Sequence, residues 1–289
     1  MKVLVTGATG FVAHQLIPAL AATGREVVAL GHDKTRMLSV DGVENVVADL
    51  HEPVPRGTVG AVDAVVHLAQ ANVPFPAGAR SLFLVNAGST QDLLSLASEV
   101  GASRFVFFSS GSVYGLGSER VTEDSSRRAG DFYATTKRIG ELLVESYGSA
   151  MSTAVLRLFA PYGPGQQRRL VPALIARVRE RRPVTLNDGG RPRMTPIFVG
   201  DVVRVVERAL ETDGNHVVNV AGDEIVGIGE LARVIGDVLG VKPVFEEGAE
   251  SVDGDLVAVN ERMHALYGID ELMPLREAMA RTVEAEVPA

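Results

Sequence analysis

The sequence contains no cysteine and no tryptophan. Without cysteine, the protein has no disulfides, no zinc sites with thiolate ligands and no cysteine nucleophile. The six histidines follow no metal-binding spacing, so we expect no metal site. No apolar run reaches the length of a membrane-spanning helix, and a predicted strand that begins at Lys2 leaves no room for a signal peptide. We therefore expect no membrane partner and a cytoplasmic location.

Clusters of positive charge are also missing. The formal net charge is −8, and no long run of lysine and arginine occurs. Neutralising nucleic-acid phosphates needs such clusters, so we expect no nucleic-acid partner. What the chain does have is 46% apolar residues over a length of 289, which is enough for a large buried core.

The most informative stretch runs from Lys2 to Leu20. Val3 to Val5 is a short apolar run typical of a buried parallel strand, and apolar residues return at helical spacing from Phe11. Gly7 and Gly10 lie between them, where the backbone has to turn and can approach a ligand closely. The N–H groups at the start of such a helix bind phosphate well, so we expect a dinucleotide site. A strand-to-helix turn without a ligand is the alternative.

Strands and helices then alternate along the chain, which predicts an α/β fold. Helical periodicity covers Ser81 to Val100 and includes Asn86. After the first strand, the expected strands are Glu26–Leu30, Val46–Ala48, Ala64–Leu68, Arg104–Ser109, Thr153–Phe159, Pro183–Leu186, Ile197–Val199 and His216–Val220. Further helices are expected at 170–181, 228–239 and from Pro274.

The end of the second strand bears on the choice of cofactor. An acidic residue there normally binds the adenosine ribose, but this chain has Gly31. His32, Lys34 and Arg36 follow, and these side chains could attract a 2′-phosphate. NADP is therefore favoured over NAD. The alternative is that the three side chains only face solvent.

Tyr133 and Lys137 are four residues apart on a predicted helix and so lie on one face. A tyrosine with a reference pKa of about 10 is a poor base unless a nearby cation stabilises its phenolate, and Lys137 is placed to do this. The turn after the fifth strand carries Ser110 and Ser112, whose hydroxyls could hold a substrate oxygen.

These segments together carry a family resemblance. The chain resembles the extended short-chain dehydrogenase/reductase family, in particular the NAD-dependent nucleotide-sugar epimerases and dehydratases. The resemblance spans nearly the whole chain and rests on T-G-A-T-G-F at 6–11, D-L at 49–50, H-L-A at 67–69, V-N-A-G-S-T at 85–90, S-S-G-S-V-Y-G at 109–115, Y-A-T-T-K at 133–137, Y-G-P-G-Q at 162–166, V-N-V-A-G-D-E at 218–224 and G-E-L-A at 229–232.

The resemblance implies roles for individual residues. Tyr133 would be the catalytic acid or base, Lys137 would also bind the nicotinamide ribose, and Ser110 would polarise the reacting oxygen. Asn86 would be structural. The remaining cofactor-binding positions would be Gly7, Thr9, Gly10, Phe11, Val12, His32, Lys34, Arg36, Asp49, Leu50, Leu68, Ala69, Phe159 and Pro161. The substrate-binding positions would be Ser112, Tyr162, Arg191 and Arg193.

The chain departs from the family pattern at several positions. Ala160 stands where epimerases of nucleotide sugars carry an asparagine that touches the diphosphate. The family's arginine in the R-x-F-x-H-V-x-D segment falls at Met194, next to Arg191 and Arg193, and the histidine of that segment is Phe198. The contacts to the substrate, including its diphosphate, are therefore expected to differ from those of the family.

The predicted fold is a Rossmann-type doubly wound parallel sheet with a smaller C-terminal substrate-binding lobe. The dinucleotide-binding domain is expected at 1–165, completed by 197–220, and the lobe at 166–196 and 221–289. By resemblance, we expect a homodimer.

The predicted function is a nicotinamide-dependent epimerase or oxidoreductase that acts on a hydroxyl or keto carbon of a nucleotide-linked sugar. The alternatives are an NADP-dependent reductase of a ketone or alcohol without a nucleotide, and a dinucleotide sensor without turnover. The presence of Ser110, Tyr133 and Lys137 favours an enzyme, since a sensor has no need of a tuned tyrosine.

Overall fold

The computed structural model describes residues 1–55 and 57–285. They form two compact units. Unit 1 comprises Met1–Tyr114, Ser126–Arg157 and Val203–Val218, and unit 2 comprises Gly115–Ser125, Leu158–Val202 and Asn219–Ala289. The domain boundaries expected from the sequence stay a prediction, and positions 286–289 of the expected lobe lie outside the described residues. Among the helices described, none is long and apolar enough to cross a membrane.

A seven-stranded sheet with the order β10-β6-β5-β4-β1-β2-β3 organises the first unit, which confirms the predicted doubly wound α/β fold. The chain order reverses direction between β1 and β4, where ligands bind in open α/β sheets. Strand β1 pairs in parallel with both β2 and β4. The strands are β1 (Lys2–Thr6), β2 (Glu26–Gly31), β3 (Val43–Val47), β4 (Ala64–His67), β5 (Arg104–Ser110), β6 (Ser152–Leu158) and β10 (Asn215–Val220).

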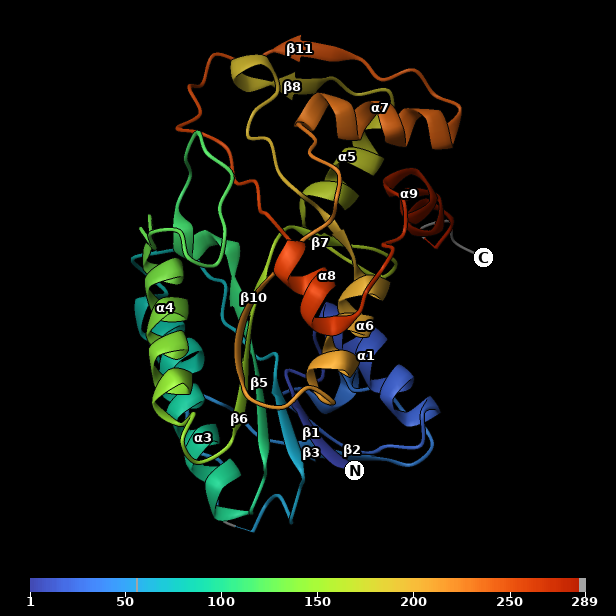
Figure 1. The fold of residues 1–289 in the computed structure, drawn as a ribbon. Coiled ribbons are helices and arrows are strands. Elements are labelled where there is room, and N and C mark those ends of the chain that lie inside the picture. Colours follow the sequence, from blue (N-terminus) through green and yellow to red (C-terminus); the bar gives the residue numbers. More distant parts are fainter. Residues whose placement is uncertain (56, 286–289) are drawn as a thin grey trace. The chain divides into compact units, whose positions relative to one another are not determined.

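Helices cover both faces of this sheet. In Figure 1, α3 (Ser89–Glu99) and α4 (Phe132–Ser146) lie on one face, and α1 (Phe11–Ala22) lies on the other. The central strands need this cover because their side chains are buried on both sides: every residue of β4 is buried, as are the last four of β1. Parallel strands joined by helices place their carboxyl ends at one edge, so the segments after β1, β4 and β5 meet there.

The helix expected over Ser81–Val100 contains an irregular turn. It consists of α2 (Ala79–Phe83), a π-helical turn at Leu84–Gly88 and then α3. The π turn contains Asn86, whose side chain is buried and hydrogen-bonded to the backbone of Ala71 and to Thr136. An inserted π turn of this kind is frequent at functional sites.

Unit 2 contains two small parallel sheets, one made of β7 (Pro161–Tyr162) and β9 (Ile197–Phe198), and one made of β8 (Val184–Leu186) and β11 (Phe245–Glu247). Its helices include α5 (Leu170–Arg179) and α7 (Ile228–Leu239), which match the expected ones, and α9 (Leu275–Glu284). The sequence reading missed β11, α8 (Glu261–Tyr267) and α6 (Val199–Ala209), the last of which begins in this unit. Helix α6 directly follows β9, so its first residues read as a continuation of an apolar strand.

Candidate active site

The turn after β1 is a tight glycine turn. Gly7 has φ +70°, a conformation that favours glycine. A Cβ at this position would lie 2.7 Å from the backbone nitrogen of Ala69, so the segments after β1 and β4 approach too closely for any side chain. The N–H of Gly10 donates to the carbonyl oxygen of Gly7 at 2.8 Å and closes the turn.

Helix α1 begins directly after this turn. Its N-cap residue, Gly10, is exposed and offers no side-chain cap, and the first turn contains no acidic residue. The N–H groups of Phe11 and Val12 precede the first intrahelical bond, and the helix dipole adds positive potential there. Thr9 is buried in the turn. A bare glycine turn with an uncapped helix start fits the pyrophosphate of a dinucleotide.

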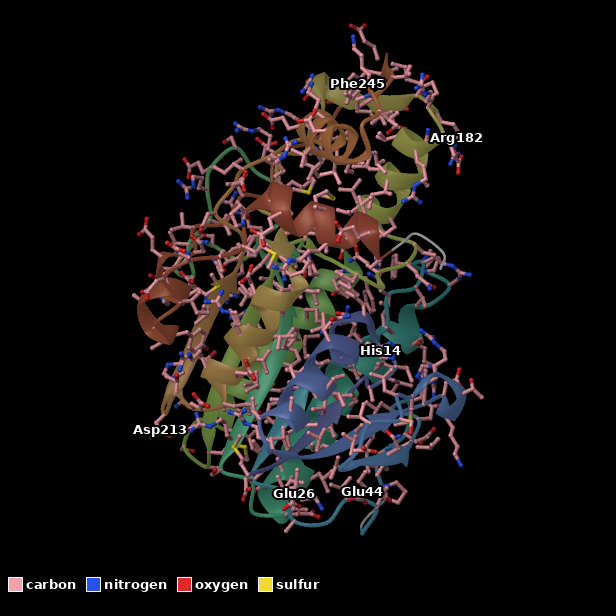
Figure 2. All side chains as sticks on the ribbon, turned by 90° about the vertical axis from the view of Figure 1, so that its right-hand side faces the viewer. His14, Glu26, Glu44, Arg182, Asp213 and Phe245 are labelled. Atoms are coloured by element: carbon pink, nitrogen blue, oxygen red, sulfur yellow. The ribbon has the colours of Figure 1, made fainter. Side chains whose placement is uncertain are left out.

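The loop after β2 folds over the glycine turn. Arg36 Nη2 donates to the carbonyl oxygen of Thr9 at 3.2 Å, and the ring of His14 on α1 contacts the carbonyl oxygen of Arg36 at 3.1 Å (Figure 2 labels His14). Arg36 therefore lies beside the predicted phosphate site. His32, Lys34 and Arg36 are all exposed. Asp33 accepts hydrogen bonds from the hydroxyl and the N–H of Thr35, which lower the pKa of its carboxyl group.

Asp49 and Leu50 follow β3. The Asp49 carboxylate is exposed and accepts from the backbone N–H of His51 at 3.0 Å and contacts its ring at 2.7 Å. These hydrogen bonds lower the pKa of Asp49, so it is a charged acceptor at neutral pH. Leu50 is buried against the core.

Beneath the glycine turn lies a buried histidine, at the end of β4 and just before Leu68 and Ala69. His67 Nδ1 contacts the hydroxyl of Thr6 at 2.7 Å, and Nε2 contacts the hydroxyl of Thr90 at 3.1 Å. The N–H of Ala69 also donates to the Thr6 hydroxyl, at 3.3 Å. Burial, together with the nearby Lys137, lowers the pKa of His67 to about 3, so the ring is neutral and joins β1 to β4 by hydrogen bonds.

Two of the predicted serines meet at the end of β5. Ser112 donates both its N–H, at 3.2 Å, and its hydroxyl, at 2.9 Å, to the Ser110 hydroxyl oxygen. Because the Ser110 oxygen accepts both bonds, its own proton is available for another acceptor. Ser110 is partly exposed, so that acceptor could be a substrate oxygen.

Helix α4 carries Tyr133 and Lys137 as expected, and Asp131 caps its start by accepting from the N–H of Ala134 at 2.7 Å. Lys137 is fully buried and donates from Nζ to the carbonyl oxygen of Phe108 at 2.7 Å. Burial lowers the pKa of Lys137 to about 7, and the Glu141 carboxylate partly opposes this. Tyr133 is partly exposed, and its hydroxyl donates to the Gln70 side-chain oxygen at 2.8 Å.

A buried ion pair supports this region, and the sequence reading missed it. Glu141, one turn after Lys137, accepts from Arg157 Nε and Nη2, both at 2.8 Å, and from the Ser109 hydroxyl at 2.6 Å. Arg157 also donates from Nη1 to the Tyr114 hydroxyl at 2.6 Å. The spacing of four residues from Lys137 was the available signal for Glu141, since it puts both side chains on one helix face.

Gln70 was also missed. It directly follows the H-L-A segment at the carboxyl end of β4, and that position was its only signal. The structure therefore brings together, within unit 1, the glycine turn, Arg36, Ser110 with Ser112, and Tyr133 with Gln70.

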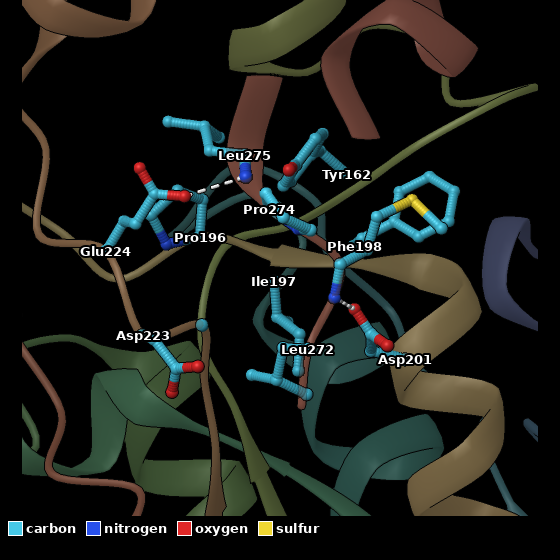
Figure 3. Close-up of a pocket in the computed structure, with 12 residues that line it drawn as sticks. Tyr162, Pro196, Ile197, Phe198, Asp201, Asp223, Glu224, Leu272, Pro274 and Leu275 are labelled. Atoms are coloured by element: carbon cyan, nitrogen blue, oxygen red, sulfur yellow. Dashed lines mark hydrogen bonds between the residues drawn. The ribbon is translucent and has the colours of Figure 1, made fainter. Parts of the chain in front are cut away.

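The remaining predicted residues lie in unit 2. Phe159 is buried, with its N–H bonded to the Val220 carbonyl at 3.0 Å, and Pro161 begins β7. Tyr162 lines a cavity of about 210 Å³ (Figure 3). Two carboxylates of this cavity are held by backbone N–H groups: Glu224 accepts from Leu275 at 2.7 Å and Asp201 from Met273 at 3.0 Å.

Burial, together with Glu224 and Asp201, raises the pKa of the Tyr162 phenol. The hydroxyl is therefore protonated at neutral pH and can donate a hydrogen bond. The other residues of the cavity are Pro196, Ile197, Phe198, Gly222, Asp223, Leu272 and Pro274.

The segment from Arg191 to Met194 departs from the family pattern, as expected. Met194 is buried and pairs through its backbone with Val226, so no charged side chain stands at this position. Arg191 and Arg193 are exposed on the segment before it. Asp255 accepts from the N–H of Arg193 at 2.8 Å and lies 4.0 Å from Arg191 Nη2.

Residues 3–221 match the family described as "NAD dependent epimerase/dehydratase family". A dTDP-4-dehydro-6-deoxy-D-allose reductase from a Streptomyces species is 30% identical, over 97% of this chain and 94% of that protein. The 2-alkyl-3-oxoalkanoate reductase of Stenotrophomonas maltophilia is 33% identical, over 65% of this chain and 59% of its own length. Among solved structures, MoeE5 in complex with UDP-glucuronic acid and NAD is 26% identical, with a TM-score of 0.88 over 99% of this chain and 98% of that one.

Proposed function

Since the chain belongs to the NAD-dependent epimerase/dehydratase family and is an NAD(P)-dependent enzyme of that family, we propose that it reduces a keto group of a nucleotide-linked sugar to a hydroxyl. The observation that carries this proposal is the arrangement at the carboxyl end of β5 and the start of α4. Ser110 has a hydroxyl proton to offer, Tyr133 is partly exposed, and Lys137 is buried one turn further along the same helix.

The roles of these residues follow from their chemistry. The Ser110 hydroxyl donates to the substrate carbonyl oxygen and polarises it. The Tyr133 hydroxyl gives its proton to that oxygen as the carbon is reduced. The charged form of Lys137 stabilises the phenolate that Tyr133 leaves behind, and the hydrogen bond to Phe108 holds the lysine in place.

The nicotinamide supplies the hydride. The chain would hold its pyrophosphate at Gly7, Gly10 and the N–H groups of Phe11 and Val12, where the bare helix start fits an anion. Asp49 and Leu50 would bind the adenine, while Leu68 and Ala69 would border the dinucleotide. Phe159 and Pro161 would border the nicotinamide.

NADP is our proposed cofactor. Gly31 places no carboxylate at the end of β2, and Arg36 lies beside the glycine turn. A guanidinium binds a phosphate well, so Arg36 could bind the 2′-phosphate. The solved relative MoeE5 binds NAD, which makes a direct comparison necessary. Titration of both cofactors is expected to give tighter binding of NADP, and Arg36→Ala should reduce that advantage more than Lys34→Ala. Tighter NAD binding would refute this choice.

We further propose that the enzyme does not carry out the 4,6-dehydration known in this family. That elimination uses an Asp-Glu pair after the catalytic hydroxyl residue, and Gly111 and Ser112 stand at those positions. Neither can move protons as a carboxylate does at neutral pH. Incubation with nucleotide hexoses should yield no 4-keto-6-deoxy product.

The substrate proposal rests on the full-length reductase relative, which acts on a dTDP-linked keto sugar. Ser112, Tyr162, Arg191 and Arg193 are the proposed contacts, with the diphosphate held differently because Ala160 and Met194 replace the family's polar residues. Binding assays with UDP, dTDP, GDP and CDP test this. If the cofactor binds and none of these nucleotides does, the alternative substrate, a ketone without a nucleotide, is the better proposal. The 2-alkyl-3-oxoalkanoate reductase relative favours this alternative.

An epimerase is the second candidate function. It is favoured by MoeE5, whose solved structure is in complex with UDP-glucuronic acid and NAD and is matched over 98% of its chain. An epimerase regenerates its cofactor in each cycle and has no need to release it, whereas a reductase must exchange it. Analysis of the cofactor retained through purification separates the two: stoichiometric bound NAD would favour the epimerase.

The central test of the proposal is Tyr133→Phe. We expect this variant to bind cofactor normally and to lose at least about a hundredfold in turnover, because general acid–base residues contribute this much. Turnover at the wild-type rate would refute the role of Tyr133. Cofactor binding without any turnover in the wild type would favour the dinucleotide sensor instead. The homodimer and the cytoplasmic location stay predictions.

A further inference from the structure

The hydroxyl that the proposed reaction uses already has a partner in the protein. Tyr133 donates its proton to the side-chain oxygen of Gln70 at 2.8 Å. The two residues are 63 positions apart, so the contact depends on how the segment after β4 passes the start of α4. Gln70 is exposed, and Tyr133 is partly exposed. A substrate can therefore reach the hydroxyl while Gln70 is in place.

The backbone on both sides of Gln70 is held firmly. On one side, the N–H of Ala69 donates to the Thr6 hydroxyl at 3.3 Å. On the other, the Asn86 side chain bonds Ala71 twice: its oxygen accepts from the Ala71 N–H at 2.7 Å, and its nitrogen donates to the Ala71 carbonyl at 3.1 Å. An exposed side chain between two fixed neighbours can change its orientation without moving the loop.

The same asparagine also reaches α4. Asn86 Nδ2 donates to the Thr136 hydroxyl at 3.0 Å, and that hydroxyl donates to the Tyr133 carbonyl at 2.7 Å. The loop that carries Gln70 and the helix that carries Tyr133 are thus joined through one buried side chain in the π turn. This connection sets the distance between the Gln70 amide and the phenol.

An amide suits a group that changes its protonation state. The Gln70 oxygen can only accept, which matches the neutral phenol, and the Gln70 nitrogen can only donate, which matches the phenolate. Rotation of the terminal amide exchanges the two. A carboxylate or a hydrocarbon at this position could not bond to both forms of the tyrosine.

We infer that Gln70 is a further catalytic residue, which contacts the reacting hydroxyl and bonds to Tyr133 in both protonation states. This inference rests on the proposed role of Tyr133. In the free enzyme, the amide oxygen accepts the phenol proton and fixes its direction. In the reaction, the Tyr133 O–H bond breaks, an O–H bond forms on the substrate oxygen as its carbon receives a hydride from the reduced nicotinamide, and the negative charge stays on the phenolate. The Gln70 amide then rotates so that its nitrogen donates to that phenolate. Gln70 itself neither gains nor loses an atom.

Two charged groups lie within four residues of Tyr133 on the same helix element. On α4 these are Lys137, one turn further on, and Asp131 at the N-cap, whose carboxylate is bonded to the Ala134 N–H. The end of β5 contributes the hydroxyls of Ser110 and Ser112, and the segment after β4 contributes the Gln70 amide. A substitution at Gln70 therefore adds its effect to that of Lys137, which remains in every variant.

The test measures the pKa of Tyr133 directly. The chain has five tyrosines, so ¹³C NMR of protein labelled at the tyrosine Cζ gives few resonances, and the signal absent from Tyr133→Phe identifies position 133. In Gln70→Glu, the added carboxylate should raise the pKa of Tyr133 by about one unit, since a like charge disfavours the phenolate. In Gln70→Leu, both states lose their partner, so the pKa should move little while turnover falls about fivefold, the effect of one lost hydrogen bond.

Gln91→Glu is the matched control. Gln91 donates to the hydroxyl of Tyr147 at 2.8 Å, in the same unit, so this variant makes the same chemical change beside a tyrosine that has no part in the proposed reaction. It should leave the pKa of Tyr133 and the turnover unchanged. An unchanged pKa of Tyr133 in Gln70→Glu, with unchanged turnover in both Gln70 variants, would overturn the inference.

The experiments distinguish a failure of the Gln70 inference from a failure of the proposed function. If Tyr133→Phe is fully active, the role of Tyr133 fails and the Gln70 inference fails with it. If Tyr133→Phe is inactive and the Gln70 variants behave as wild type, only the inference about Gln70 fails. The NMR titration needs no substrate and can be run with and without NADP.

Discussion

Arg157 and Glu141 form a two-point ion pair inside the first unit, with Nε to Oε1 and Nη2 to Oε2 both at 2.8 Å. Both side chains are almost completely buried. Hydrogen bonds from Arg157, Ser109 and Arg138 outweigh the effect of burial and lower the pKa of Glu141. The pair joins α4 to β6 beside the strand end that carries Ser110.

Removing one partner of this pair should be costly. Glu141→Gln leaves the Arg157 guanidinium buried without its counter-charge, and we expect it to lower the free energy of unfolding by about 3–5 kcal/mol. The double variant Glu141→Gln/Arg157→Met should lose less than the sum of the two single variants. Glu277→Gln, which breaks an exposed pair with Arg281, should cost at most about 0.5 kcal/mol. Urea titration measures all of these, and a mild effect of Glu141→Gln would show that the buried pair is weak.

Lys137→Met should affect both binding and rate. The variant keeps an unbranched side chain, one atom shorter than lysine, but removes the charge that stabilises the Tyr133 phenolate, so turnover should fall by about a hundredfold. The affinity for the cofactor should fall as well, because the resemblance gives Lys137 a second role at the ribose. Fluorescence titration of NADPH measures the second effect. Unchanged cofactor affinity would remove that role and leave the first intact.

His67 should make the fold sensitive to acid. Its folded pKa of about 3 lies below the unfolded value of 6.5, so below pH 6.5 protons bind to the unfolded chain and not to the buried ring. The stability that comes from the neutral ring is therefore complete above pH 6.5 and falls by about 1.4 kcal/mol per pH unit as the pH drops toward 3.

His67→Gln isolates this contribution, because glutamine keeps a donor and an acceptor but does not titrate. The difference in unfolding free energy between wild type and His67→Gln should shift in favour of the variant as the pH drops from 7 to 5. Parallel pH profiles for wild type and His67→Gln would contradict the assignment.

Ala160 has φ +39°, in the left-handed region that side chains with a Cβ adopt at a cost. Ala160→Gly should remove that cost and raise the free energy of unfolding by about 1 kcal/mol. Ala160→Asn should also stabilise the fold, by less, because asparagine tolerates this region better than alanine does. Ala173→Gly in helix α5 is the opposing control and should lower stability by about 1 kcal/mol. A loss of stability in Ala160→Gly would show that the backbone there is not strained.

The sequence by itself determined the alternation of buried strands and helices, the glycine turn and the common helix face of Tyr133 and Lys137. These features depend on local periodicity and on residues a few positions apart, so the sequence reading predicted the sheet and the positions of β1, β2, β4 and β5 closely. It missed α6 because a helix that starts directly after a strand shows no break in its apolar pattern.

Only the tertiary structure decided which distant side chains meet. Gln70 reaches Tyr133, Arg157 reaches Glu141, and Arg36 reaches the glycine turn, over separations of 63, 16 and 27 residues. The π turn, which directs the Asn86 side chain to the loop after β4, could likewise not be predicted from the helical periodicity. Such contacts arise when strands and helices pack together. A single sequence records the propensity of each element, and it does not record the register and rotation with which one element meets another.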